Sequence, residues 1–169
     1  MEITLDQLLA SRESRWHRQQ EILRNYPEKT LVCLTVIMPG KVKRNFSSLI
    51  VAQAALTALI NQFSGHSHII LVQDLDTGFE AFLITDYNIA EAKHMTCEIE
   101  DSHPLGRLFD IDVIGKDGAP VSRTETGSPA RRCLLCNNEA RFCMRNHTHS
   151  PSELHEKINK MVENYVQRV

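Results

Sequence analysis

Apolar and polar residues follow two different spacings along this chain. From residue 4 to 25 apolar residues recur at helical spacing, which predicts a long helix with Thr4 as its N-cap. Residues 31–38 form an almost continuous apolar run rich in β-branched side chains, which is typical of a central strand. The same patterns predict two more helices, at 47–63 (capped by Ser47 or Ser48) and 88–100, and three more strands, at 68–73, at 79–85 and within the stretch 103–114.

The order of these elements predicts the fold class. From residue 31 onward it is strand, helix, strand, strand, helix, strand, the split βαβ order of a ferredoxin-like α+β fold. We therefore expect an antiparallel sheet with helices on one face and an added N-terminal helix. Ser150-Pro151-Ser152-Glu153 has the form of a capping box and opens a last helix. The length suits a single domain over 1–169, with a core at 28–122 and a Cys-rich segment and helix at 123–169.

Composition and charge narrow the class of protein. The net charge of −2 excludes a general polyanion binder, so an anion site has to be local. Few aromatic residues lie among the arginines, which argues against nucleic acid as a partner. The acidic start is unlike a secretory signal, and no apolar run approaches the roughly 20 residues that span a membrane. A cytoplasmic protein without a membrane partner is expected.

Two acids in the last predicted strand suggest a metal site. Asp110 and Asp112 are two residues apart, so in a strand they project side by side while Phe109, Ile111 and Val113 face the core. Paired carboxylates of this kind hold Mg²⁺ against substrate phosphates. By the same count Arg107 lies on their side, and arginine suits phosphate oxygens. A solvated strand face that carries acids is the alternative interpretation.

Basic residues gather at two places near the N-terminus. Arg12, Arg15 and Arg18 share one face of the first predicted helix. Lys43 and Arg44 stand in the glycine-containing turn after the first strand. Both groups fit an anion-binding surface, and the alternative for each is an ordinary solvated segment.

A cysteine cluster precedes the last helix. Cys133 and Cys136 have the C-x₂-C spacing of a zinc knuckle, and Cys143 with His147 or His149 completes a set of four ligands. Four protein ligands would make such a zinc structural, because a catalytic zinc keeps one position for water. Small buried apolar cysteines on a helical turn are the alternative. Arginines surround the cluster and suggest one wall of a phosphate pocket: Arg131, Arg132, Arg141 and Arg145.

Together these motifs resemble those of the apo-citrate lyase phosphoribosyl-dephospho-CoA transferases, also called holo-citrate lyase synthases. The resemblance covers nearly the whole chain. It is carried by R-E-x-R-x-x-R-Q at Arg12 to Gln19, P-G-x-x-K-R at Pro39 to Arg44, H-P-L-G-R-L-x-D-x-D-V at His103 to Val113, and R-R-C-L-L-C-x₆-C-x-R-x₃-H at Arg131 to His149. The segment G-R-L-F-D-I-D-V is also similar to the strand motif of pterin pyrophosphokinases, which bind Mg²⁺-triphosphate on a ferredoxin-like fold.

The resemblance implies a reaction and roles for residues. Triphosphoribosyl-dephospho-CoA would donate its phosphoribosyl-dephospho-CoA group to a serine of the citrate lyase acyl carrier protein, releasing pyrophosphate. Asp110 and Asp112 would hold Mg²⁺, His103 would be the general base, and His149 would be the histidine of the cysteine cluster. Arg107 and the substrate-binding set would contact the phosphates, that set being Arg12, Arg15, Arg18, Lys43, Arg44, Arg131, Arg132 and Arg145. Two other functions fit the motifs less fully: a non-catalytic zinc-binding adaptor and a small-molecule pyrophosphokinase.

Overall fold

The computed structural model describes residues 1–168, and its elements follow the predicted order. They are α1 (Leu5–Asn25), β1 (Thr30–Val36), α2 (Phe46–Gln62), β2 (Ser67–Leu75), β3 (Gly78–Thr85), α3 (Ile89–Ser102), β4 (Phe109–Ile114), α4 (Ala140–Asn146) and α5 (Pro151–Val166). Thr4 and Ser150 cap α1 and α5 in capping boxes, as predicted. The N-cap of α2 is Asn45, not Ser47 or Ser48, and its side chain accepts a hydrogen bond from the Ser48 N–H at 2.8 Å. The helix α4 was not predicted.

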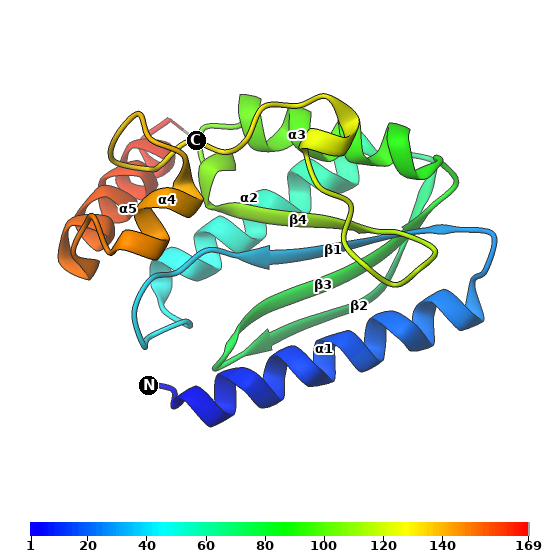
Figure 1. Cartoon of the computed structure of the whole chain (residues 1–169), viewed down its shortest axis with the longest axis horizontal. Coiled ribbons are helices and arrows are strands. Elements are labelled where there is room, and N and C mark those ends of the chain that lie inside the picture. Colours follow the sequence, from blue (N-terminus) through cyan, green and yellow to red (C-terminus); the bar gives the residue numbers. More distant parts are fainter. Residues whose placement is uncertain (169) are drawn as a thin grey trace.

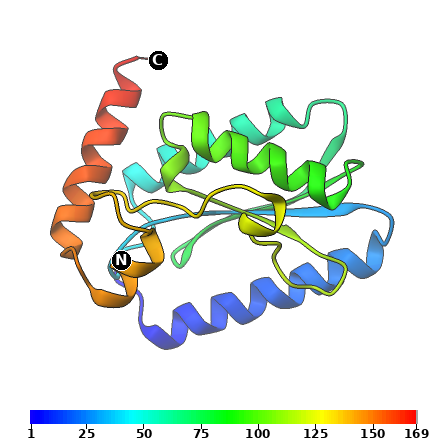
Figure 2. The same cartoon turned by 45° about the horizontal axis from the view of Figure 1, so that its top comes forward.

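The four strands form an antiparallel sheet in the order β2-β3-β1-β4. Figure 1 shows α2 and α3 on one face of this sheet and α1 along the other, with α4 and α5 at one end. Figure 2 shows the same layers turned. The expectation that the helices lie on one face therefore holds for α2 and α3, and α1 covers the second face. Within residues 1–168 no helix combines the length and the apolar character that crossing a membrane requires.

The two faces of the sheet differ in character. The face under α2 and α3 carries the larger core, which includes Phe109, Ile111 and Val113 and extends to Ile158 and Val162 of α5. The smaller core under α1 is built around Ile22 at the C-terminal part of that helix. Burying these apolar side chains drives the layers together.

The sheet-facing side of α1 is polar over its first half. The apolar residues Leu5 and Trp16 are 68% and 51% exposed, and Ile22 is the one buried residue of the helix. Half-buried residues instead recur at Ser11, Arg15 and Arg18. A helix that turns charged residues toward a sheet breaks the usual binary pattern, and such breaks mark functional sites.

Candidate functional site

The paired acids lie beneath α1 in the alternation expected of a strand. Asp110 and Asp112 are half-buried, while Phe109, Ile111 and Val113 between and beside them are buried in the larger core. The Thr35 hydroxyl donates to Asp110 Oδ2 at 3.0 Å. Burial raises the pKa of Asp112, and the neighbouring Asp110 carboxylate raises it further. Two carboxylates that repel each other suit a divalent cation. A bound cation neutralises the repulsion and replaces the water that the buried carboxylates have lost.

A third acid shares this face and was missed in the sequence. In the sheet register Asp110 on β4 pairs with Thr35 on β1, which pairs with Glu80 on β3. Glu80 is only 5% exposed, and Arg15 of α1 lies 3.7 Å from its Oε1. Burial raises the pKa of Glu80, while Arg15 and Arg18 lower it. The sequence feature that could have revealed Glu80 is its position as the single acid in an otherwise apolar strand, Phe79-Glu80-Ala81-Phe82-Leu83-Ile84.

Basic side chains approach the same end of the sheet from α1 and from the turn after β1. Burial and the Arg12 charge lower the pKa of Lys43, so these two cations lie near each other. Arg18 lines an open cavity of about 290 Å³ between α1 and the β2–β3 hairpin, together with Ser11, Ser14, Gln73, Leu75, Asp76, Thr77 and Glu80. Arg44 points elsewhere, since it binds both carboxylate oxygens of Asp74 at 2.9 and 2.8 Å. Arg15 and Arg18 thus lie near Glu80, and Arg15 is also near enough to Asp112 to act against the rise in its pKa. Lys43 and Arg12 lie near each other, and Arg44 binds the hairpin.

The structure does not bring His103 to the acids. The imidazole packs against Phe109 and Tyr165, with ring centroids 4.8 and 5.5 Å away, and it accepts the Leu105 N–H at 3.0 Å. Phe109 belongs to the core on the α2 and α3 face, opposite the face that carries Asp110. The sheet therefore lies between His103 and the carboxylates, and this geometry does not support His103 as their general base.

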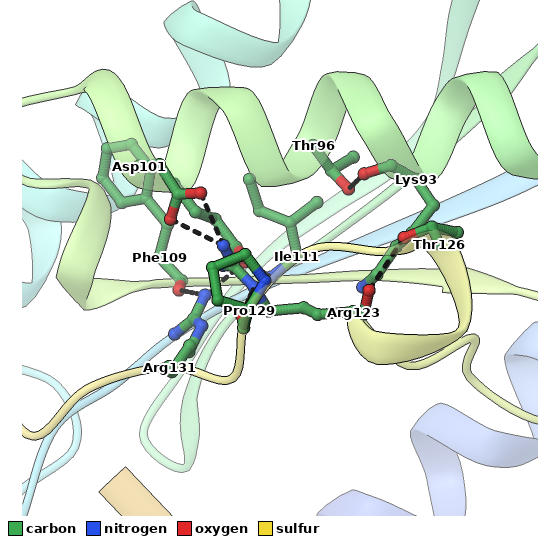
Figure 3. A network of polar contacts seen from close by, with 10 residues as sticks. Lys93, Thr96, Asp101, Phe109, Ile111, Arg123, Thr126, Pro129 and Arg131 are labelled. Carbon is green, nitrogen blue, oxygen red and sulfur yellow. Dashed lines mark hydrogen bonds and ion pairs between the residues drawn. The ribbon is translucent and has the colours of Figure 1, made fainter. Parts of the chain in front are cut away.

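Arg131 and Arg107 lie at the outer edge of β4. Glu100 of α3 is 4% exposed and forms ion pairs with Arg131 and with Arg123, the latter at 2.8 Å. Figure 3 shows Arg123 and Arg131 beside Asp101 and Phe109 at this edge. Glu100 also accepts the Ile111 N–H at 2.9 Å, and Arg131 donates to the Phe109 carbonyl at 2.6 Å. Arg107 lies in a 3₁₀ turn, Gly106–Leu108, so the strand count used for it does not apply. Burial lowers its pKa, as do Arg131 and Arg123.

The glycine of the same turn is required by close packing. A Cβ on Gly106 would lie 2.3 Å from the Glu100 carbonyl oxygen and 2.8 Å from that of Ile99. Backbone atoms cannot move aside as a flexible side chain can. Gly106 therefore allows the end of α3 to pack closely against the turn that precedes Asp110.

The three clustered cysteines and His149 lie together and form a candidate metal site. Their ligand atoms, one from each of Cys133, Cys136, Cys143 and His149, all lie within 4.8 Å of one another. Cys136 Sγ is 3.4 Å from both Cys143 Sγ and His149 Nε2. Tetrahedral zinc with Zn–S near 2.3 Å separates its sulfurs by about 3.8 Å, so the spacing fits. Hydrogen bonds from the Asn138 backbone and from His149 lower the pKa of Cys136 to about 6, and metals bind the thiolate form.

Comparison with known proteins places the chain in a family. Residues 3–165 match the family described as apo-citrate lyase phosphoribosyl-dephospho-CoA transferase. The chain belongs to this family. A probable apo-citrate lyase phosphoribosyl-dephospho-CoA transferase from Vibrio cholerae serotype O1 is 40% identical over 171 residues, covering 98% of this chain and 94% of that protein. One of the same name from Streptococcus pyogenes is 34% identical over 170 residues, covering 96% and 87%.

A longer relative also matches. Protein CitXG of Haemophilus influenzae is 35% identical over 166 residues, which cover 96% of this chain and 36% of that protein. The chain therefore spans about a third of that relative and nearly the full length of the other two.

The segments that carry the family resemblance meet at one end of the sheet. The α1 segment brings Arg12, Arg15 and Arg18, the turn after β1 brings Lys43, and the start of β4 brings Asp110. Arg131 reaches β4 through the Phe109 carbonyl. Arg132 and Arg145 are exposed around the cysteine cluster, with Arg132 donating to the Asn137 carbonyl at 2.9 Å. The transferase family motifs thus form one polar end of the molecule, with His103 on the far side of the sheet.

Proposed function

We propose that this protein transfers the phosphoribosyl-dephospho-CoA group from triphosphoribosyl-dephospho-CoA to a serine of the apo citrate lyase acyl carrier protein. Membership of the transferase family over residues 3–165 carries the proposal. It also favours a transferase over a zinc-binding adaptor or a small-molecule pyrophosphokinase. The strand order β2-β3-β1-β4 supports assigning the ferredoxin-like arrangement to the fold.

The chemistry is phosphoryl transfer with pyrophosphate as the leaving group. The serine oxygen attacks the phosphorus nearest the ribose, and the bond from that phosphorus to pyrophosphate breaks. Such transfer depends on positioning the reactants and on neutralising phosphate charge. Asp110 and Asp112 fit Mg²⁺, which when bound would neutralise charge on the triphosphate.

The cations beside the acids have complementary roles. Arg15 and Arg18 of α1 face the sheet, Arg12 stands one turn earlier on the same helix, and Lys43 lies in the turn after β1. We assign these four residues to the triphosphate, because together they bring positive charge to the end of the sheet where Asp110 lies. We assign Arg131 to holding the edge of β4, since its guanidinium is already bound by Glu100 and the Phe109 carbonyl.

Mass spectrometry of the carrier protein tests the proposed reaction. Incubating the apo carrier with this protein, the triphosphoribosyl donor and Mg²⁺ should add the mass of the phosphoribosyl-dephospho-CoA group to the carrier and release one pyrophosphate per group. A carrier whose acceptor serine is replaced by alanine should gain no mass. No gain with a carrier and donor that are competent in a reference reaction would overturn the proposal.

We also propose that the cysteine cluster holds a structural Zn²⁺ through Cys133, Cys136, Cys143 and His149. The Leu135 N–H donates to Cys133 Sγ at 3.5 Å, which fixes the sulfur within the knuckle. Leu134 packs against the main core, so an ordered knuckle would anchor this segment to the sheet.

Metal analysis distinguishes this zinc site from packed free cysteines. The purified protein is expected to contain one zinc per chain, and Cys136→Ser should lose it, because zinc has little affinity for a serine hydroxyl. Cys97→Ser is the matched control, since Cys97 is buried in α3, away from the cluster. Protein without zinc, or Cys136→Ser with an undiminished zinc content, would contradict the assignment.

A further inference from the structure

On the sheet face beneath α1, Thr35 lies between Asp110 and Glu80. Asp110, Thr35 and Glu80 are register partners on β4, β1 and β3. Adjacent strands lie about 4.8 Å apart, so the backbones at Asp110 and Glu80 are separated by about 10 Å. All three side chains project toward α1. A group that lies over Thr35 would have the acid pair on one side and Glu80 on the other.

We propose that Glu80 accepts the proton of the acceptor hydroxyl during transfer, an inference that rests on the proposed function. As the hydroxyl oxygen bonds to phosphorus, the bond from that phosphorus to pyrophosphate breaks and pyrophosphate leaves with the electron pair. The hydroxyl proton passes to a carboxylate oxygen of Glu80. Atoms and charge balance without any further reactant.

The surroundings of Glu80 suit this role. Its carboxylate is nearly excluded from water, which makes it a stronger base than an exposed glutamate. Arg15 at 3.7 Å and the nearby Arg18 favour the ionised form that a base needs. The cavity of about 290 Å³ beside it is open, so a hydroxyl on a second molecule can reach it.

The other titratable groups near the acids are less suited. Glu100 is bound by Arg123 and Arg131 at the outer edge of β4. Burial raises the pKa of Cys33 to about 12, so its thiol stays protonated near neutral pH. His103 lies on the far face. Asp76 lines the same cavity as Glu80 but is exposed, so Glu80 is the buried carboxylate of that cavity.

Chemical rescue tests the proton-accepting role. Glu80→Ala should lower kcat by about 10²–10⁴-fold, the usual contribution of a positioned base, while the KM for the donor changes little. Sodium formate should restore kcat by about tenfold or more, because a small carboxylate can occupy the space that alanine leaves and take the proton. Binding of the donor to Glu80→Ala, followed by calorimetry without turnover, should match the wild type.

Rescue by formate separates this role from a structural one. If Glu80 served only to hold Arg15, formate would not restore kcat, because a free carboxylate that takes no proton adds nothing to the chemical step. Arg15→Met, which removes a residue assigned to the triphosphate, should instead raise the KM for the donor and should not respond to formate. If Glu80→Ala does not fold, Glu80→Gln replaces it in the test, because glutamine keeps the shape of the side chain. This variant should show a lower kcat and a nearly unchanged KM for the donor.

The outcomes separate the two proposals. Absence of transfer by the wild-type protein overturns the proposed function and this inference with it. Transfer by the wild type, combined with Glu80→Ala that keeps its turnover or is not rescued by formate, overturns the inference alone. A folded Glu80→Gln with wild-type kcat does the same.

Discussion

Replacing Asp110 with asparagine is expected to lower transfer by about 10³-fold while the free energy of unfolding changes by less than about 1 kcal/mol. The loss follows because asparagine keeps the shape and the Thr35 hydrogen bond but removes one of the two charges that would hold the cation. Stability is preserved because the change also relieves the repulsion that raises the pKa of Asp112. Initial rates of carrier modification and denaturant unfolding measure the two quantities.

Asp86→Asn is the matched control for that change. Asp86 follows β3 at the opposite end of the sheet, where it forms an exposed ion pair with Lys29. Exposed pairs contribute little to stability, and this one is remote from the acids, so both transfer and unfolding should stay near wild type. Equal activity of Asp110→Asn and Asp86→Asn would refute the role of the acid pair.

Glu100→Ala is expected to lower the free energy of unfolding by about 3–5 kcal/mol, the usual cost of removing one partner from a buried ion pair. The substitution leaves Arg123 and Arg131 without their shared carboxylate and deprives the Ile111 N–H of its acceptor. Glu100 is held away from water at 4% exposure, and this burial raises the pKa of its carboxyl group. Urea titration followed by far-UV circular dichroism measures the loss.

Asp101→Ala provides the comparison, because Asp101 binds the same Arg123 guanidinium from the surface. Its side chain is 54% exposed, and loss of such an exposed partner should cost less than about 1 kcal/mol. If the two variants were equally stable, the burial of Glu100 would not be what holds this edge together.

The periodic elements could be predicted because each has a single dominant pattern. The run Leu31 to Met38, the capping box at Ser150 and the alternation around Asp110 are local signals, and the structure follows them. The short helix α4 lacks such a signal, since its seven residues carry no apolar stripe and its N-cap residue Glu139 makes no side-chain cap. The start of α2 was misplaced because Asn45 and the two serines after Phe46 are all good caps.

The site could be predicted only in part, because its residues come together through the tertiary fold. Asp110 and Asp112 are close in sequence, so their common face follows from strand geometry. His103 is close in sequence to Asp110 as well, yet the turn at Gly106 carries it to the other face. Glu80 is thirty residues from Asp110, and only the pairing of both strands with β1 makes them neighbours. Helical spacing alone could not give the orientation of α1, because its apolar residues Leu5 and Trp16 are exposed and the Arg15–Glu80 ion pair lies against the sheet.

The covered edge of β4 has a consequence for how the chain folds during synthesis. The outward backbone groups of β4 are satisfied by Glu100, which precedes the strand, and by Val121 and Arg131, which follow it. A nascent chain that has reached residue 114 holds all four strands but lacks the part of the cover that comes later. Until residues 121–131 emerge, β4 presents open hydrogen-bonding groups on which another nascent chain can add a strand. We therefore expect the loop between β4 and α4 to protect the sheet against aggregation during synthesis, and a chain that ends after residue 114 to aggregate more readily.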